Sequence, residues 1–419
     1  MSSSNNSNLS IAGLENWFKT MRVGNGYGGP SIGPNGISVD YCGAAFDWRL
    51  EGLLDGYTAM YRSSGNSDYL DLISRDLHSI VSAQLLNGSF RNSWFDQNPY
   101  EGGMPYEPAM LAAACRARKT LTESNCPVPD GFDAAIERFV ETRLLNELWN
   151  RLLHTFNNWL QSEFEYYTPH AVAAAIELLI DYAELRDDWV RLETYITGAA
   201  DSLCAVQRSD GAIPLSSRPN SPVSPTLAAR CIPALVKTAQ KTGQGKYSKA
   251  AEDLSKFVRR QTFPTGGFPC LMETNRPPQQ FPIILGAAAD TVNSLERADL
   301  LIPEDIQTLE DLLVDRQMSS GAFQTAIGFG GFSEKQRIPD WRDVLPCCGW
   351  QDKIYSFLAR HHPNKQNDFS SGSIQMKVRI CGKHGHYQET SQIIQITNRQ
   401  EQVIYRWNKG FKWASVNRL

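Results

Sequence analysis

Long hydrophobic runs are absent from this chain of 419 residues. No segment approaches the roughly 18 consecutive apolar residues that a membrane-spanning helix needs, so we expect no membrane span. The first residues, Met-Ser-Ser-Ser-Asn-Asn-Ser-Asn, lack the basic and apolar regions of a secretory signal peptide. The nine cysteines are odd in number and irregularly spaced, which is typical of reduced thiols. These features predict a cytoplasmic protein.

An excess of charge of one sign is also absent. The formal net charge is −4, and the basic and acidic residues are interspersed along the chain. This pattern lacks the basic stripe of a nucleic-acid-binding surface, so we predict no nucleic-acid partner. Neither a phosphate-binding loop nor a dinucleotide-binding fingerprint occurs, and we predict no cofactor.

What the chain does contain is a repeat. A glutamine is followed by a short gap, a glycine and then a large apolar residue in four segments: Gln84–Phe90, Gln207–Ile213, Gln261–Phe268 and Gln317–Phe323. The steps between successive glutamines are 123, 54 and 56 residues. Degenerate copies are expected at Tyr27-Gly28-Gly29 and near 143–150. The spacing thus predicts six units of roughly 55 to 60 residues, as in a repeat architecture.

The segments between the glycine turns have helical periodicity. Residues 69–84 place apolar side chains at three- and four-residue steps, and 249–260 and 304–314 repeat this amphipathic design. Residues 171–183 are almost wholly apolar, which is typical of a helix buried on most sides. Each glycine supplies the positive φ needed at the following turn. The glutamine is expected to bond carbonyl and amide groups at that turn.

With these repeats the chain resembles the α/α-toroid superfamily over about residues 14–360. Terpenoid cyclases and protein prenyltransferase β subunits carry a similar glutamine–glycine–aromatic repeat, and several polysaccharide lyases and glycan epimerases share the toroid. The resemblance implies a mainly α fold, an α/α toroid of about six helical hairpins arranged as a closed double ring. It specifies the fold better than the chemistry.

The last part of the chain has a different pattern. A polar linker follows Arg360, and the apolar period then drops towards two in Ile374–Ile380, Ile393–Ile396 and Gln402–Trp407. Gly382–Gly385 is expected to form one of the separating turns. The sequence therefore predicts a small antiparallel β module at 372–419.

The first candidate site segment holds carboxylates at four-residue steps. Asp47, Glu51 and Asp55 are predicted to share one helix face, with Arg49 nearby. Paired carboxylates can act as general acid and base when one is desolvated. The alternative is an acidic, solvated helix face.

The second candidate is the segment after the Gly88 turn, which mixes aromatic, acidic and glycine residues without helical spacing. Beside a toroid cavity, such a loop is expected to contact a ligand, although it can equally be a packed irregular loop. Its candidate binding residues are Asp96, Tyr100, Glu101, Tyr106 and Glu107.

The third candidate precedes the apolar helix at 171–183. Its polar and aromatic residues are His154, Asn157, Asn158, Trp159, Tyr166, Tyr167 and His170. Pro169 is suited to a first helical turn, which places His170 near a helix N-terminus, where the dipole favours neutral imidazole. The alternative is an aromatic cluster whose polar groups are all bonded within the protein.

The resemblance to toroidal polysaccharide lyases gives these residues roles. Asn157 or Asn158 would neutralise a uronate carboxylate, His170 or His154 would abstract the C5 proton, and Tyr166 or Tyr167 would donate one. This implies lyase or C5-epimerase chemistry on an acidic small-molecule or oligosaccharide substrate, with Trp159 in the binding site.

Three other functions stay open. They are a glycoside hydrolase with paired carboxylates, a terpenoid cyclase-like protein and a non-catalytic glycan-binding toroid. The Asp-x-Asp-Asp motif of class II terpene cyclases and the Asp/Cys/His zinc set of protein prenyltransferases are absent.

Vicinal cysteines raise one further alternative. Cys347 and Cys348 are candidate zinc ligands together with histidines or the cysteine of the C-terminal region, such as His361 or Cys381. No Cys-x-x-Cys spacing supports this, and free cysteine is usually a small core residue. We therefore predict no metal site.

Overall fold

The structure is a computed structural model. It describes residues 9–33, 36–39, 41–91, 104, 106–158, 165–273, 276–329, 331, 338–363 and 372–417.

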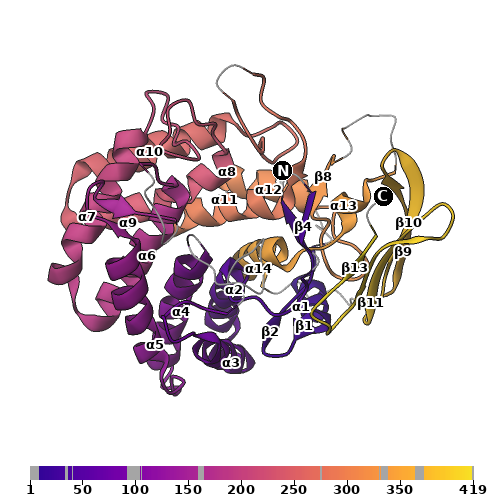
Figure 1. Cartoon of the computed structure of the whole chain (residues 1–419), viewed down its shortest axis with the longest axis horizontal. Coiled ribbons are helices and arrows are strands. Elements are labelled where there is room, and N and C mark those ends of the chain that lie inside the picture. Colours follow the sequence, from indigo (N-terminus) through magenta and orange to yellow (C-terminus); the bar gives the residue numbers. More distant parts are fainter. Residues whose placement is uncertain are drawn as a thin grey trace, which may run out of the picture.

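Inner helices form a closed ring in the described part of the chain (Figure 1). They are α2 (Trp48–Ser64), α4 (Tyr106–Glu123), α6 (Pro169–Arg186), α8 with α9 (Pro225–Ala229 and Cys231–Thr242), α11 (Leu285–Arg297) and α14 (Cys348–His361). Each packs on the next, and α14 packs on α2, which closes the ring. Apolar residues occupy most of these helices because both faces are covered.

Outer helices surround the ring and alternate with the inner ones along the chain. They are α1 (Ile11–Thr20), α3 (Asp68–Ala83), α5 (Phe132–Arg138) continued by the π-helix η1 (Phe139–Leu148), α7 (Trp189–Val206), α10 (Gly245–Arg260) and α12 (Pro303–Leu313). The helices predicted over 69–84, 171–183, 249–260 and 304–314 are confirmed as α3, α6, α10 and α12. The chain therefore has the predicted α/α-toroid fold.

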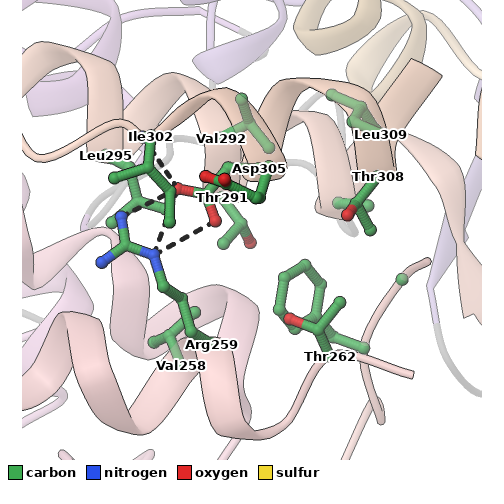
Figure 2. Close-up of a pocket in the computed structure, with 14 residues that line it drawn as sticks. Val258, Arg259, Thr262, Thr291, Val292, Leu295, Ile302, Asp305, Thr308 and Leu309 are labelled. Carbon is green, nitrogen blue, oxygen red and sulfur yellow. Dashed lines mark hydrogen bonds and ion pairs between the residues drawn. The ribbon is translucent and has the colours of Figure 1, made fainter. Parts of the chain in front are cut away.

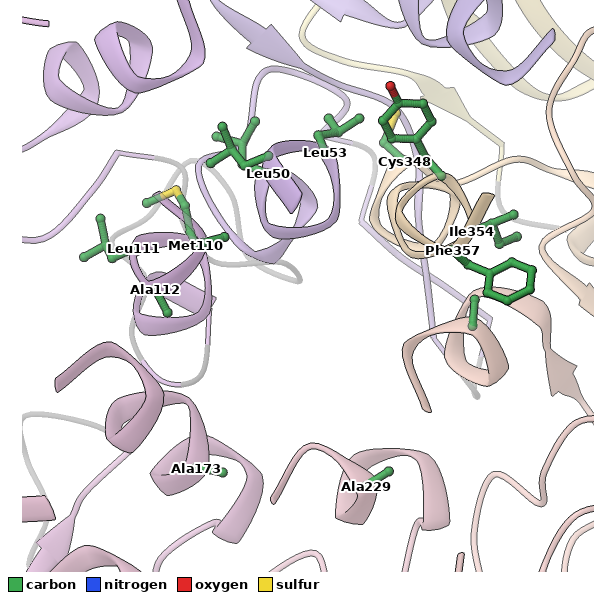
Figure 3. Close-up of a cluster of buried hydrophobic side chains, with 14 of the residues drawn as sticks. Leu50, Leu53, Met110, Leu111, Ala112, Ala173, Ala229, Cys348, Ile354 and Phe357 are labelled. Atoms are coloured by element: carbon green, nitrogen blue, oxygen red, sulfur yellow. The ribbon is translucent and has the colours of Figure 1, made fainter. Parts of the chain in front are cut away.

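The core lies between the two rings of helices. Figure 3 shows members of this buried cluster on the inner helices, including Leu50 and Leu53 of α2, Met110 of α4 and Phe357 of α14. These side chains are at most 1% exposed. Inner-helix faces turned away from the axis are thus apolar, which leaves the axial face for polar side chains.

The repeated glutamines tie each outer helix to the next. Nε2 of Gln207 donates to the carbonyl oxygen of Gly211 in its own turn (3.0 Å) and to that of Ala250 in α10 (2.9 Å). Gln84 makes the equivalent pair of bonds to its own glycine and to α5. The glutamine bonds its own turn, as predicted. In addition, its amide bonds a carbonyl group of the neighbouring helical hairpin.

The last copy of this contact closes the outer ring. Nε2 of Gln317 donates to the carbonyl oxygens of Gly321 (2.8 Å) and Ser10 (2.7 Å), and its Oε1 accepts from the backbone N–H of Ser10 (2.7 Å). Ser10 caps α1 through its Oγ, which accepts from the N–H of Gly13 (3.1 Å). Gly321 has φ +95°, and a Cβ there would lie 2.0 Å from the Gly13 carbonyl oxygen. Only glycine satisfies both conditions.

One copy departs from the pattern. The side chain of Gln261 makes no hydrogen bond to another described residue, and an ion pair takes its place. Arg259 at the end of α10 binds Asp305 of α12 at 2.8 Å. The degenerate copies at 27–29 and 143–150 also fall where an outer helix gives way to the next inner one.

Short two-stranded sheets line several of these turns. Their strands are β1 (Arg22–Val23) with β2 (Gly26–Tyr27), β3 (Ser31–Gly33) with β4 (Gly36–Val39), β5 (Trp149–Asn150) with β6 (Thr155–Phe156), and β7 (Ile283–Ile284) with β8 (Ala326–Ile327). A short helix, α13 (Trp341–Val344), precedes α14.

The C-terminal residues form a five-stranded antiparallel sheet in the order β13-β12-β11-β10-β9. Its strands are β9 (Ile374–Ile380), β10 (Lys383–Glu389), β11 (Ile393–Asn398), β12 (Val403–Asn408) and β13 (Ser415–Val416). The turn predicted at Gly382–Gly385 is confirmed at Gly382 and wrong beyond it, because β10 begins at Lys383 and contains Gly385. A Cβ at Gly385 would lie 2.4 Å from both Ile380 Cδ1 and the Thr397 carbonyl oxygen, so this glycine permits a close strand approach.

The sheet is bound to α1. Nε1 of Trp17 donates to Oε1 of Glu389 (2.9 Å), and Lys409 donates to the same oxygen (2.9 Å). Sheet and helices also share one hydrophobic core. The division into domains at 14–360 and 372–419 remains a prediction.

Candidate functional site

An aromatic cluster lies where three inner helices begin. The ring of Trp48, the first residue of α2, packs edge-on against Tyr106 of α4 at 5.4 Å and lies 5.7 Å from the ring of Trp350 in α14. Trp350 is fixed by a 2.6 Å hydrogen bond from its Nε1 to the carbonyl oxygen of Ile32 in β3. Helix starts and anchoring strands therefore hold these rings rigidly.

The remaining inner helices add small or aliphatic side chains to this cluster. They are Ala109 of α4, Ala174 of α6, Leu227 of α8 and Ala287 of α11. His170 is the second residue of α6, four before Ala174, so it lies on the same helix face one turn nearer the N-terminus. Every inner helix thus contributes to one end of the toroid axis.

A layer of charged side chains lies one helical turn deeper. Four members of the cluster are each followed, three residues later, by a charged residue. The pairs are Trp48 and Glu51, Leu227 and Arg230, Ala287 and Asp290, and Trp350 and Lys353. A three-residue step keeps each on the axial face of its helix. Their exposed fractions are between 2% and 4%, so the whole layer is buried.

Arg230 connects this layer. Its Nη2 donates to both oxygens of Glu51 (2.9 and 2.7 Å), and its Nη1 donates to Oδ2 of Asp290 (2.7 Å). The guanidinium also lies over the ring of Trp48, 5.3 Å from its centroid. Lys353 donates to Oε2 of Glu51 at 2.7 Å. These bonds involve the two Nη atoms only, so the guanidinium, which carries five N–H groups, keeps donor capacity for a ligand.

A proline explains how Arg230 reaches the axis. α8 ends at Ala229 and α9 begins at Cys231, so Arg230 lies at a break between two helices. Pro233 has no N–H to bond the carbonyl of Ala229 four residues earlier, and the helix is interrupted there.

Burial and charge set the protonation states at this site. Burial and then the charge of Arg230 lower the pKa of His170 from 6.5 to about 3, so its imidazole is neutral at pH 7. The direction agrees with the sequence prediction, although the causes are burial and a neighbouring cation. Burial alone raises the pKa of Glu51, but Arg230 and Lys353 outweigh it and hold that pKa well below its usual value.

The other end of the axis is an ion-pair collar around a pocket of about 560 Å³. Arg116 of α4 binds Asp55 of α2 (3.0 Å) and Asp181 of α6 (2.8 Å), and Lys237 of α9 also binds Asp181 (2.8 Å). These pairs join neighbouring inner helices, and cations near helix C-termini offset the partial negative charge there. We therefore assign this end a structural role.

A smaller, mainly apolar pocket of about 210 Å³ lies between α10, α11 and α12 (Figure 2). Figure 2 shows the guanidinium of Arg259 directed at Asp305 beside Ile302 and Leu295. The charged groups of its lining are this pair and Glu304. The pocket thus offers less for acid–base chemistry than the axial site.

Asp47, Glu51 and Asp55 were predicted to share one helix face. This is correct for Glu51 and Asp55, which both face the axis at different depths, and wrong for Asp47. Asp47 precedes the helix as its N-cap, and its Oδ1 accepts from the N–H of Arg49 (3.0 Å). The two side chains also form a buried ion pair (3.2 Å). The alternative of a solvated face is wrong as well, since Glu51 is 4% exposed.

The residues of the third segment separate in space. His154 is exposed and packs beside Trp149 of β5 and Gly198 of the outer helix α7. It therefore lies away from His170. Oδ1 of Asn157 accepts from Asn150 (3.0 Å) within the β5–β6 hairpin.

The two tyrosines also turn away from the axial cluster. The hydroxyl of Tyr167 donates to the carbonyl oxygen of Ser202 in α7 (2.7 Å). Tyr166 is exposed and lies under the guanidinium of Arg218. Asn158 alone stays near α6, because its Nδ2 donates to Oγ1 of Thr168, the N-cap.

The second segment is described only in part. Tyr106 joins the aromatic cluster, whereas buried Glu107 accepts a 2.7 Å bond from the N–H of Phe90 and thereby holds the repeat turn. Gln351 holds the turn at Phe323 in the same way. Four predicted site residues lie outside the described residues: Asp96, Tyr100, Glu101 and Trp159.

The sequence reasoning missed Arg230, Asp290, Lys353 and Trp350 as site residues. A usable signal was present, since Arg230 and Asp290 are isolated charges in otherwise apolar segments, Leu-Ala-Ala-Arg-Cys-Ile and Ala-Ala-Ala-Asp-Thr-Val. An isolated charge in a buried helix needs a partner, which points to the axis.

Neither a metal-ligand cluster nor a membrane-spanning helix occurs in the described part of the chain. Among the described residues, no three His, Cys, Asp or Glu side chains are grouped as metal ligands. Cys347 and Cys348 are buried near Arg49 instead. No helix in the described ranges is long and apolar enough to cross a membrane.

Several solved structures with the same architecture are sugar enzymes. A D-mannose isomerase aligns with a TM-score of 0.58 and 10% identity, over 84% of this chain and 96% of that one. A heparin-specific unsaturated glucuronyl hydrolase gives 0.59 and 12%, over 87% and 98%. Cellobiose 2-epimerase from Bacillus thermoamylovorans gives 0.57 and 11%, over 83% and 97%.

At these identities the likeness establishes the fold, and the chain is an α/α toroid. No protein-family model matches the chain, and no curated protein sequence matches it significantly.

Proposed function

We propose that this protein is a carbohydrate-active enzyme that moves a proton at a sugar carbon next to a carbonyl group, as in isomerisation or epimerisation. The observation that carries the proposal is the place of His170 at the start of α6, on the helix face of Ala174 and the aromatic cluster, where burial and the charge of Arg230 lower the pKa of its imidazole. A neutral imidazole accepts a proton, and a fixed cation stabilises the negative charge that the carbonyl oxygen acquires.

In this scheme His170 removes the proton, and the C–H electron pair shifts to give an enediolate whose oxygen lies near Arg230. The unused N–H groups of Arg230 donate to that oxygen. The charge of the enediolate opposes the effect of Arg230 on the histidine, so His170 becomes more basic as the proton moves. Return of the proton to the neighbouring carbon, with the hydroxyl proton passing from one oxygen of the enediolate to the other, completes isomerisation. Epimerisation follows when the enediolate turns so that His170 returns the proton to the opposite face of the same carbon.

The surroundings suit a sugar. Trp48, Tyr106 and Trp350 offer aromatic faces for the apolar C–H faces of a sugar ring, above a polar layer that can bond hydroxyl groups. Enzymes named for mannose, cellobiose and glucuronyl substrates share the fold, which supports the substrate class.

The same proton transfer at C5 of a uronate gives the lyase or C5-epimerase activity predicted from the sequence. Two observations favour a neutral reducing sugar over a uronate. Arg230 is already paired with two carboxylates, and the side chains of Asn157 and Tyr167 are bonded away from the axis. A uronate carboxylate would therefore meet a layer whose positive charge is largely neutralised.

Glycoside hydrolysis needs a protonated carboxyl group beside the leaving oxygen. Glu51 is held ionised, Asp47 is paired with Arg49, and Glu107 bonds the N–H of Phe90. Among the described residues, these three carboxylates are therefore already ionised or bonded within the protein. The charged layer also fits a terpenoid, which offers few hydrogen-bonding groups, less well than a sugar.

A substrate panel tests the proposal. The protein is incubated with neutral aldoses, ketoses, reducing disaccharides and uronate oligomers, and products are separated by ion chromatography while absorbance reports unsaturated uronates. We expect a neutral sugar to be converted to its isomer or epimer. Unsaturated product alone would favour the uronate form, and binding without conversion would make the protein a glycan-binding toroid.

A further inference from the structure

One oxygen of the buried charged layer has no partner. Oδ2 of Asp290 accepts the 2.7 Å bond from Arg230, whereas Oδ1 is buried without a hydrogen-bond partner in the described part of the chain. Asp290 is 4% exposed. Leaving such an oxygen without a donor costs about 1 to 3 kcal/mol or more for a charged group, so a native protein usually supplies one.

The neighbouring hydroxyl groups do not serve this oxygen. Oγ1 of Thr291 donates to the carbonyl oxygen of Ala287 (3.0 Å), and Oγ of Ser294 donates to the backbone carbonyl of Asp290 (2.8 Å). Glu51 differs, because Arg230 and Lys353 between them bond both its oxygens. Glu51 thus serves as an anchor for the cations, while Asp290 keeps one acceptor unused.

The position of Asp290 connects this acceptor with the aromatic cluster. It lies one turn below Ala287, which belongs to the same cluster as Trp48 and Trp350. At the level of Ala287, α4 and α6 contribute the methyl groups of Ala109 and Ala174. Small side chains on three helices therefore lie one turn above this buried acceptor.

We propose that Oδ1 of Asp290 accepts a hydrogen bond from one hydroxyl group of a neutral sugar, and so determines which sugar is bound. This inference rests on the proposed function and narrows its substrate class. A hydroxyl donates to the carboxylate and can accept from a free N–H of Arg230. A carboxylate in its place would be repelled by Asp290 and Glu51, so a uronate is excluded from this position.

A binding cycle tests the proposal. The affinity of the wild-type protein and of D290A is measured by calorimetry for the preferred neutral sugar and its monodeoxy analogues. In the wild type, loss of one particular hydroxyl should weaken binding roughly 10- to 100-fold, as expected for a hydrogen bond to a charged group. In D290A the same loss should matter less than about twofold, because the two changes remove the same bond.

D290N guards against misfolding of the alanine variant. Its amide oxygen can keep the bond to Arg230 while a neutral N–H group replaces Oδ1, so discrimination at that hydroxyl should fall from that of a bond to a charged group to that of a neutral one. If both variants weaken every analogue equally, Asp290 only positions Arg230 and the inference is overturned while the proposed function stands. If the wild type neither binds nor converts any neutral sugar, both proposals fail.

Discussion

Replacing the repeat glutamines by alanine should destabilise the toroid in proportion to the bonds that each one makes. Gln317 makes three part-buried hydrogen bonds, two of them to Ser10 across the ring closure. Gln207 makes two, to Gly211 and α10. At about 1 kcal/mol per bond, Q317A should lower the free energy of unfolding by about 3 kcal/mol and Q207A by about 2 kcal/mol.

Gln261 is the matched control, because its side chain bonds no other described residue. Q261A should stay within about 0.5 kcal/mol of the wild type. Urea unfolding followed by far-ultraviolet circular dichroism ranks the three variants, and hydrogen exchange over α1 should rise most in Q317A. Equal losses in Q261A and Q317A would refute the assignment of the glutamine bonds as the ties between repeats.

Three further predictions concern the inner helices, including Asp352 of α14, whose Oδ2 accepts from the N–H of Gly52 in α2 (3.1 Å). H170A should reduce turnover at least 10³-fold while shifting the melting temperature by less than about 2 °C. The control is H78A, because His78 of α3 is exposed. A large loss of stability in H170A would show that His170 is a core residue. Burial raises the pKa of Asp352 from 3.8 to about 7, so the folded protein keeps a proton that the unfolded chain releases, and stability falls as pH rises from about 4 to 7. D352N should therefore gain about 2 to 3 kcal/mol relative to wild type between pH 5 and pH 8 in urea unfolding, and an unchanged difference would contradict this pKa. R116M should cost about 2 to 4 kcal/mol because it leaves two aspartates in the collar without that partner, and a neutral effect would show that the collar is dispensable.

Most of the fold could be predicted from two features of the sequence, the repeat and the helical periodicity. Apolar spacing located α3 within one residue at each end, since its buried face is set by its own side chains. Closure of the ring was implied only by the family resemblance, because the bond between Gln317 and Ser10 spans 307 residues. Strand β10 was missed because Gly385, which looks like a turn residue, is required there by close packing.

The candidate site was less predictable for a physical reason. Its residues come from different inner helices, and each becomes functional only when the ring brings its axial face to the others. His170 was found because Pro169 marks a helix start. Arg230 was missed because its exposure to the axis depends on the helix break caused by Pro233, which single-helix periodicity does not show.

Solvent deuterium exchange tests the central claim most directly. The preferred sugar from the panel is incubated in D₂O with wild-type protein, H170A or H78A, and nuclear magnetic resonance follows the hydrogen on the carbon next to the carbonyl group. The account predicts deuterium at that carbon with wild type and H78A, and none above background with H170A, although H170A still binds the sugar. Undiminished deuterium uptake and conversion with H170A would contradict proton transfer by His170.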